Sequence, residues 1–397
     1  MTETRREYGV WLRRHHVGTL NQRGDYTWFS PDPEYLADPE RPVLGLVFEE
    51  TPGARHSSAL RLPPWFSNLL PEGRLRQWIA GQRHVSGDRE MELLAEVGHD
   101  LPGAVRVLPE DSAPQRAAGD LGFSLAGVAL KFSMLRDGDR LTLPACGQGG
   151  DWIVKPPDPF HADVPRNEYA MMSLAAAVGI DVPEVLLVDR ADLAGLPSHA
   201  WRSSEELAYA VRRFDRDEQR RPVHIEDFAQ LRNTYPNQKY EGSSETVAFF
   251  AYRYRDLAAL REFARRTAFN VLISNGDAHL KNWSLIYRDP RIPTLAPAYD
   301  LVSTAHYQDA GDFENLALKF GKTRRFDRIS LDTFERLQRR LRVPRAGLPE
   351  VVAETVERAR REWPRFAPLL DSNPALRDSI AASIEQRSTT LLERTTA

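Results

Sequence analysis

A polar segment at residues 274–283 carries side chains that could transfer a phosphoryl group. Asp277 and Asn282 stand five positions apart in it, which is the D-x-x-x-x-N spacing of a kinase catalytic loop. The carboxylate can accept the proton of an attacking hydroxyl group, and the amide oxygen can bind magnesium, a cation that prefers hard oxygen ligands. His279 and Lys281 lie between them and could direct positive charge at the transferring group. The same segment also fits a plain polar turn after a helix.

A second carboxylate and a lysine strengthen this interpretation. Asp300 follows a short strand-like stretch, at the point where a kinase needs a further acidic ligand for magnesium. Lys155 ends the apolar run 151–154, and an ammonium group there can bind the α- and β-phosphates of a nucleotide. Glu168, at the start of the next helical stretch, is its natural ion-pair partner. Taken singly, these residues also fit simpler roles, as a turn aspartate or a solvated lysine at a strand end.

A glycine-containing turn at 124–131 is the fourth part of the pattern. It reads Ser-Leu-Ala-Gly-Val-Ala-Leu-Lys, and a glycine there can bring backbone N–H groups close to a phosphate. Gly127 is equally compatible with an ordinary hairpin. The turn matches neither the Walker A sequence nor the G-x-G-x-x-G pattern, so those two classes of nucleotide site are not indicated.

The first part of the chain, residues 1–110, predicts a β-rich domain. Aromatic and β-branched residues alternate there with Gly, Asp and Pro turns. Strands are expected at 8–12, 17–20 and 26–29, and Ser86 can cap a helix that carries Met91 to Val97. Small polar residues at 110–120 predict a linker to the next domain.

The rest of the chain predicts a sheet followed by helices. Residues 121–226 indicate strands and one helix, 167–178, with Gly179 at the position that ends it. Residues 227–397 are mainly helical, with amphipathic stretches at 351–363 and 380–392. A small β lobe, a helical lobe and a cleft between them form the α+β, two-lobed layout of protein kinases. Layout by itself does not fix function.

Composition narrows the function classes further. The formal net charge is -3, so no overall basic field draws the chain toward nucleic acid. The single cysteine, Cys146, excludes an internal disulfide and argues against a cysteine-based zinc site, which fits a reducing cytosol. The polar start does not resemble a signal peptide, and no run approaches the roughly 18 apolar residues of a membrane span. We therefore expect a cytoplasmic protein without membrane contact.

In this order, the motifs resemble the HipA family of serine/threonine kinases, which are toxins of HipA–HipB-type toxin–antitoxin pairs. The resemblance covers most of the chain. Residues 65–73 are similar to the family's N-terminal couple domain, and 124–131 to its glycine loop. Residues 211–216 resemble the hinge of the family's nucleotide site. Further similar motifs lie at 153–155, 167–169, 224–230, 239–241, 277–282 and 299–300.

The resemblance implies a role for each candidate residue. Asp277 would be the catalytic base, while Asn282 and Asp300 would bind Mg²⁺. Lys155 would hold the phosphates of ATP, with Glu168 as its partner. Backbone atoms of the hinge would hold the adenine, and further side chains would line the nucleotide. These hinge and lining residues are Arg212, Phe214, Gly127, Val128, Asp215, His279 and Lys281.

The resemblance also implies self-inactivation. Ser124 matches a serine that family members autophosphorylate, which ejects the glycine loop and stops ATP binding. A phosphate there would add about -1.5 to -2 charges, enough to move a loop. The loop departs from the family pattern at Val128, Ala129 and Leu130, where A-Q-x is frequent, and this departure bears on the loop's geometry. Arg212 replaces a frequent Glu, which matters less because the hinge contact is made by the backbone.

In function, the resemblance implies an ATP-dependent protein kinase that acts as a toxin. Its substrate would be a translation-related protein, such as an aminoacyl-tRNA synthetase. Its partner would be a helix-turn-helix antitoxin of the HipB type, with operator DNA bound only through the antitoxin complex. Two other functions remain open: an antitoxin-bound transcriptional co-regulator, and a small-molecule kinase, since aminoglycoside kinases use similar catalytic loops.

Overall fold

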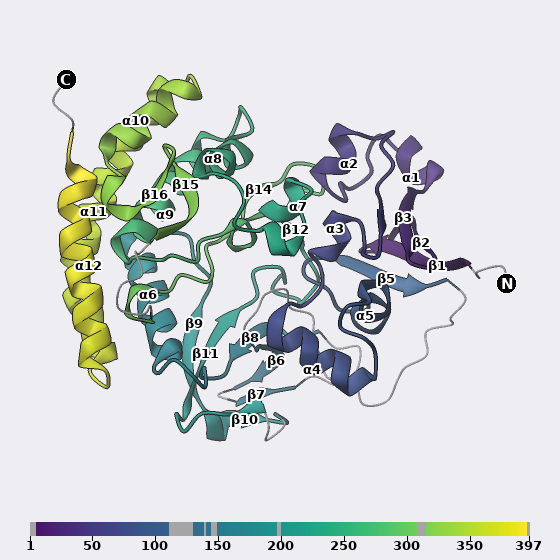
Figure 1. Ribbon diagram of the computed structural model, residues 1–397, viewed down its shortest axis with the longest axis horizontal. Coiled ribbons are helices and arrows are strands. Elements are labelled where there is room, and N and C mark those ends of the chain that lie inside the picture. Colours follow the sequence, from purple (N-terminus) through teal and green to yellow (C-terminus); the bar gives the residue numbers. More distant parts are fainter. Residues whose placement is uncertain are drawn as a thin grey trace.

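The structure is a computed structural model that describes residues 5–110, 130–138, 140–143, 149–196, 200–307 and 315–394. The predictions for Ser124, Gly127 and Val128, and the cysteine Cys146, lie outside the described residues. Figure 1 shows three parts: a β-rich N-terminal part, a second sheet, and a helical part at the opposite end, with the two termini far apart.

An antiparallel sheet of order β4-β3-β2-β1-β5 forms the N-terminal part. Alternate residues of a strand point to one face, so Tyr8, Val10 and Leu12 of β1 all enter the core. The predicted strands at 8–12, 17–20 and 26–29 are confirmed. The strands of this sheet are β1 (Arg5–Leu12), β2 (His15–Arg23), β3 (Tyr26–Pro31), β4 (Ser57–Ala59) and β5 (Val105–Pro109).

The N-terminal part also contains helices. The prediction that Ser86 caps the last of them is wrong. The helix begins only at Glu90, after the N-cap residue Arg89, and the Ser86 hydroxyl instead accepts a bond from the Asp88 N–H at 3.3 Å in the preceding turn. The helices are α1 (Pro33–Ala37), α2 (Leu46–Glu50), α3 (Pro64–Ser67), α4 (Gly73–Arg83) and α5 (Glu90–Val97).

The second sheet has the order β10-β7-β6-β8-β11-β9, and α6 (Val164–Val178) packs on β9 and β11. Gly179 ends α6 as predicted: its φ is 95°, and its N–H is bonded to carbonyl groups of the last turn. The strands are β6 (Phe132–Asp137), β7 (Arg140–Thr142), β8 (Trp152–Lys155), β9 (Val185–Asp189), β10 (Leu193–Ala194) and β11 (Leu207–Arg212).

The C-terminal part is mainly helical, as predicted, but it also contains two small sheets. Its helices are α7 (Phe228–Leu231), α8 (Ser244–Tyr252), α9 (Leu257–Leu272), α10 (Leu331–Arg340), α11 (Leu348–Phe366) and α12 (Pro374–Leu392). Its strands are β12 (His224–Asp227), β13 (Ser284–Tyr287), β14 (Thr294–Leu295), β15 (Asn315–Phe320) and β16 (Thr323–Arg325). Because β12 pairs with β13, a domain boundary between residues 226 and 227 would fall inside a strand.

Two hydrophobic cores organise these elements. One joins the N-terminal part to the second sheet, with Trp65, Phe66, Phe132 and Val154 among its members. The other contains the helices of the C-terminal part together with α6. The second sheet therefore packs against the N-terminal part on one side, while its helix packs with α11.

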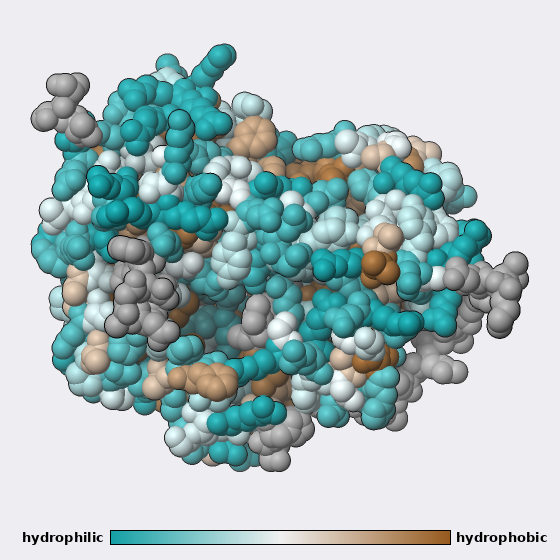
Figure 2. All heavy atoms as spheres, in the orientation of Figure 1, coloured by the Kyte–Doolittle hydropathy of each residue, from teal (hydrophilic) through white to brown (hydrophobic). Residues whose placement is uncertain are grey.

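The surface is mostly polar in the view of Figure 2, where hydrophobic residues form small separate areas. Among the helices that the structure describes, none has the length and apolar character needed to cross a membrane.

Candidate active site

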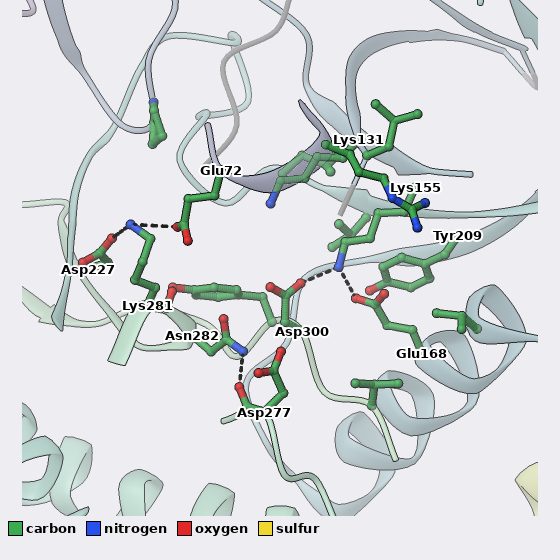
Figure 3. Close-up of a pocket in the computed structure, with 18 of the residues that line it drawn as sticks. Glu72, Lys131, Lys155, Glu168, Tyr209, Asp227, Asp277, Lys281, Asn282 and Asp300 are labelled. Carbon is green, nitrogen blue, oxygen red and sulfur yellow. Dashed lines mark hydrogen bonds and ion pairs between the residues drawn. The ribbon is translucent and has the colours of Figure 1, made fainter. Parts of the chain in front are cut away.

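A cavity of about 800 Å³ lies where the three parts of the chain meet. Its volume falls within the usual range for small-molecule sites. All three parts contribute polar side chains to its lining, among them Glu72, Lys131, Lys155, Asp277, Asn282 and Asp300 (Figure 3).

Lys155, at the end of β8, is the central cation of the cavity. Its ammonium group donates to Glu168 on α6 at 2.6 Å and to Asp300 from the C-terminal part. Burial by itself would lower the pKa of Lys155, but the two carboxylates together raise it above its ordinary value. The predicted pairing of Lys155 with Glu168 is present, and Asp300 lies on the other side of the same ammonium group.

Asp300 has an unusual backbone. Its φ is 54°, in the left-handed region that aspartate tolerates better than most residues and that often marks functional positions. Burial alone would raise the pKa of its carboxyl group, but Lys155 and Lys131 hold this pKa below its usual range. Asp300 is therefore ionised at physiological pH, as a metal ligand must be.

Asp277 and Asn282 lie together, as their spacing predicts. The Asn282 side-chain amide donates to the backbone carbonyl of Asp277 at 2.8 Å. The carboxylate of Asp277 accepts a hydrogen bond from the hydroxyl of Tyr240 at 2.5 Å. Burial raises the pKa of Asp277, and the bond from Tyr240 acts in the opposite direction by stabilising the charged form.

The donor set suits magnesium. Because the Asn282 nitrogen is bonded to the carbonyl of Asp277, its amide oxygen is the atom left to face the cavity, on the side of Asp300 (Figure 3). Among the described residues, no three His, Cys, Asp or Glu side chains gather into a metal cage. One carboxylate and one amide, completed by phosphate oxygens and water, are the ligands that Mg²⁺ usually takes in phosphoryl-transfer sites.

His279 lies beside Asp277 but is neutral. Burial and the nearby Lys239 ammonium together lower the pKa of His279 to about 3. Its Nε2 is 3.9 Å from the Asp277 carboxylate, and within the described chain its Nδ1 has no hydrogen-bond partner. A neutral imidazole cannot supply the positive charge that the sequence pattern suggested, although it can still line the cavity.

Lys281 points toward the N-terminal part. Its ammonium group donates to the backbone carbonyl of Asn68 at 2.9 Å, to the Asn68 side-chain oxygen at 3.1 Å, and to Asp227 at 2.6 Å. These three acceptors match the three N–H groups of a lysine. A contact between Lys281 and phosphate would require one of these bonds to break, so that role stays a prediction.

The hinge region provides an apolar slot with Ile153, Val211 and Phe214 on its walls. The N–H of Arg212 is bonded to the Glu184 carbonyl at 2.9 Å, so this group is not available to adenine. The aromatic ring of Phe214 lies 5.4 Å from that of Tyr299. The contact of the Arg212 and Phe214 backbones with adenine remains a prediction.

Asp215 was predicted to line the nucleotide, but its carboxylate is bonded to groups of the protein. Its carboxylate accepts two bonds from Arg213, at 2.9 and 2.7 Å, one from Arg216 at 3.0 Å and one from the Gly103 N–H at 2.8 Å. These charges hold the pKa of Asp215 far below its usual range despite burial. Asp215 lines the cavity, but its charge stabilises the hinge against the N-terminal part.

Sequence reasoning assigned no role to Lys131. Its side chain points into the cavity in Figure 3, and no hydrogen bond or ion pair within the described chain satisfies its ammonium group. Burial and the nearby Lys155 ammonium together lower the pKa of Lys131 to about 8, against the opposing effect of the Asp300 carboxylate. The available signal was its position at the end of the glycine-containing turn. Sequence reasoning also missed three further site residues, because their contacts with residues 277–282 are long-range. These are Tyr240, Glu72 and Asn68.

Comparisons with known proteins identify the family of this chain. The HipA-like C-terminal domain matches residues 123–363, and the HipA N-terminal domain matches residues 8–108. Y4dM of Sinorhizobium fredii, which has a provisional designation as a kinase, is 42% identical over 366 residues, covering 87% of this chain and 88% of that protein. The serine/threonine-protein kinase toxin HipA of Shewanella oneidensis is 27% identical over 288 residues, covering 61% of this chain and 63% of that protein.

A solved structure has the same fold. The complex of HipA, HipB and operator DNA from Shewanella oneidensis MR-1 contains a chain that matches with a TM-score of 0.77, 97% coverage of both chains and 20% identity. The match to the HipA-like C-terminal domain alone spans more than half of the sequence. The chain therefore belongs to the HipA family of kinases.

Proposed function

We propose that this chain is an ATP- and Mg²⁺-dependent serine/threonine protein kinase that acts in the cytoplasm as the toxin of a toxin–antitoxin pair. The observation that carries the proposal is that Lys155, Asp300, Asp277 and Asn282 line one cavity, and phosphoryl transfer requires a cation, a base and two metal ligands of these types. The name of the Shewanella oneidensis relative, a serine/threonine-protein kinase toxin, supports the acceptor class and the toxin role.

The proposed reaction transfers the γ-phosphoryl group of ATP to a hydroxyl group. The hydroxyl oxygen of a serine or threonine forms a bond to the γ-phosphorus of ATP, and the bond from that phosphorus to the bridging oxygen breaks, which releases ADP. The carboxylate of Asp277 takes the hydroxyl proton. Lys155 and Lys131 would hold phosphate oxygens. Asn282 and Asp300 would bind Mg²⁺, which supplies positive charge to the phosphates.

Label transfer from γ-³²P-ATP tests the proposal. Wild type and Asp277→Asn would be incubated with ATP, Mg²⁺ and either the proteins or the metabolites of a bacterial lysate. We expect label on serine or threonine of a protein, and a rate lower by about 10²–10⁴-fold in the variant, with ATP binding retained. An undiminished rate in Asp277→Asn would contradict the assigned base. Label only in metabolites would favour a small-molecule kinase.

Autophosphorylation at Ser124 is part of the proposal, and it rests on the resemblance of residues 124–131 to the family's glycine loop. Mass spectrometry of wild type after incubation with ATP should find phosphate on Ser124, and ATP binding should fall as the phosphate accumulates. Ser124→Ala should keep its activity for longer. A wild type that stays active while Ser124 is fully phosphorylated would contradict this part.

The proposed partner is a helix-turn-helix antitoxin of the HipB type. The related solved structure contains HipB and operator DNA, and the net charge of -3 on this chain gives little reason for strong DNA binding alone. We expect the chain to shift operator DNA in a gel at physiological salt only when the antitoxin is present. Tight binding by the chain alone would contradict this. The proposed substrate is a translation-related protein, such as an aminoacyl-tRNA synthetase.

A further inference from the structure

Glu72 lies at the N-cap of α4, but its carboxylate does not cap that helix. Its side chain is 13% exposed and turns toward the cavity instead (Figure 3). There it accepts a bond from the Lys239 ammonium at 3.1 Å and lies 3.8 Å from the Lys281 ammonium. The carboxylate of Glu72 is therefore paired with these two lysines and not with the N–H groups of its own helix.

Both lysines are connected to the segment that carries Asp277 and Asn282. The backbone carbonyl of Lys239 accepts the Leu280 N–H at 3.1 Å, and the next residue, Tyr240, donates to the base Asp277. Lys281 belongs to the loop itself. A shift of the Lys239 or Lys281 backbone would therefore be passed on to the loop that carries Asp277.

These two lysines and their two carboxylate partners form a buried cluster without net charge. Lys239 and Lys281 are 8% and 4% exposed, and their carboxylate partners are Glu72 and Asp227. Asn68, from the same N-terminal segment as Glu72, supplies two neutral acceptors to Lys281. Loss of the Glu72 carboxylate would leave the buried Lys239 ammonium without its counter-charge, and movement of this lysine, together with the loop bonded to its backbone, would relieve that unfavourable state.

We infer that Glu72 is a positioning residue, by which the N-terminal β-rich domain holds the catalytic loop in its working geometry. The expected effect on the rate of phosphoryl transfer rests on the proposed kinase function, whereas the expected effect on the structure of the loop does not. A displacement of about 1 Å in a reacting group can cost on the order of 10²-fold in rate. Glu72→Gln, which keeps the side-chain shape and removes the charge, should therefore slow phosphoryl transfer by about 10–100-fold.

Glu90→Gln is a matched control. Glu90 is a buried carboxylate of the same domain, which accepts bonds from the Leu62 N–H at 2.9 Å and the Ser67 hydroxyl at 3.0 Å. It also lies 3.5 Å from the Arg76 guanidinium, and among the described residues it has no hydrogen bond or ion pair with residues 277–283. A general weakening of the N-terminal domain would affect both variants, whereas loss of loop positioning would affect only Glu72→Gln.

Two measurements on the full chain test the inference. The first compares two quantities with those of the wild type, the single-turnover rate of phosphoryl transfer and the Kd for ATP·Mg²⁺. In Glu72→Gln the rate should fall, while the Kd should change by less than about threefold. The second is hydrogen–deuterium exchange of peptides that cover residues 277–283. The Leu280 N–H should exchange faster in Glu72→Gln than in the wild type and in Glu90→Gln, whatever the chain's activity.

A double variant provides a charge test. Lys239→Met combined with Glu72→Gln leaves Lys281 and Asp227 as a balanced pair, so the double variant should lose no more rate than Glu72→Gln alone. Unchanged exchange at Leu280 in Glu72→Gln, or an equal change in Glu90→Gln, would overturn the inference. If the wild type transferred no label, the proposed kinase function would fail, while the exchange result would still decide the role of Glu72.

Discussion

The ammonium group of Lys155 on β8 forms an ion pair with the carboxylate of Asp300, which follows β14, so the second sheet and the C-terminal part meet at one contact inside the cavity. Each residue fixes the charge of the other: the pKa of Lys155 is raised and that of Asp300 is lowered, in both cases against the effect of burial. Both groups are therefore charged over the physiological pH range, which suits one to phosphate and the other to magnesium.

Replacing Lys155 by Met should weaken ATP binding. The variant lacks the central cation that would hold the phosphates, so we expect the Kd for ATP·Mg²⁺ to rise at least about tenfold, a loss of about 1.4 kcal/mol of binding free energy. Calorimetric titration measures it directly, and a smaller thermal shift with ATP gives a second readout. Lys319→Met, on the exposed face of β15, is the control. Equal ATP affinity in Lys155→Met and the control would refute the phosphate role.

Replacing Asp300 by Asn should act on magnesium. The amide cannot supply the charged oxygen that Mg²⁺ prefers, so the Mg²⁺ concentration for half-maximal transfer should rise at least about tenfold. The measurement is a magnesium titration of label transfer at saturating ATP. Asp289→Asn, at an exposed turn outside the cavity, should leave the titration unchanged. An unshifted titration in Asp300→Asn would mean that Asp300 is not a metal ligand.

Replacing Tyr240 by Phe should change the pH dependence of transfer. Burial raises the pKa of Asp277, and the hydrogen bond from the Tyr240 hydroxyl partly offsets this. Without the hydroxyl, the pKa of Asp277 rises further, so the base becomes protonated at a higher pH and the acid limb of the rate profile moves upward. Tyr254→Phe, on an exposed tyrosine, provides the comparison. An acid limb that stays in place, or moves to lower pH, would contradict the contact.

His224 should make the fold acid-sensitive. It is buried between the N-terminal part and β13, its Nε2 lies 2.8 Å from the Leu44 carbonyl, and burial lowers its pKa from 6.5 to about 4. Between these two values the unfolded chain binds more protons than the folded chain, so stability is lost as the pH falls. Denaturant unfolding at about pH 7 and pH 5 should give a smaller loss for His224→Gln than for the wild type. An exposed histidine variant, His15→Gln, should lose as much stability as the wild type, and equal losses in all three chains would refute the assignment.

The sequence alone determined the parts of this protein that depend on local spacing. The D-x-x-x-x-N interval brings Asn282 into hydrogen-bond contact with the Asp277 backbone, and the apolar run before Lys155 forms a strand that ends in the cavity. The amphipathic stretches at 351–363 and 380–392 lie inside α11 and α12. These features were predictable because helix and strand periodicity is encoded within a few neighbouring residues.

Only the tertiary structure decided which charges are available in the site. The spacing suggested that Lys281 or His279 could provide positive charge, and the resemblance to the HipA family implied that Asp215 lines the nucleotide. The fold instead bonds Lys281 to Asn68, 213 positions away, and Asp215 to Gly103, 112 positions away, and it buries His279 so that it is neutral. Burial and long-range partners set the charge and direction of such groups, and neither is encoded in local sequence spacing.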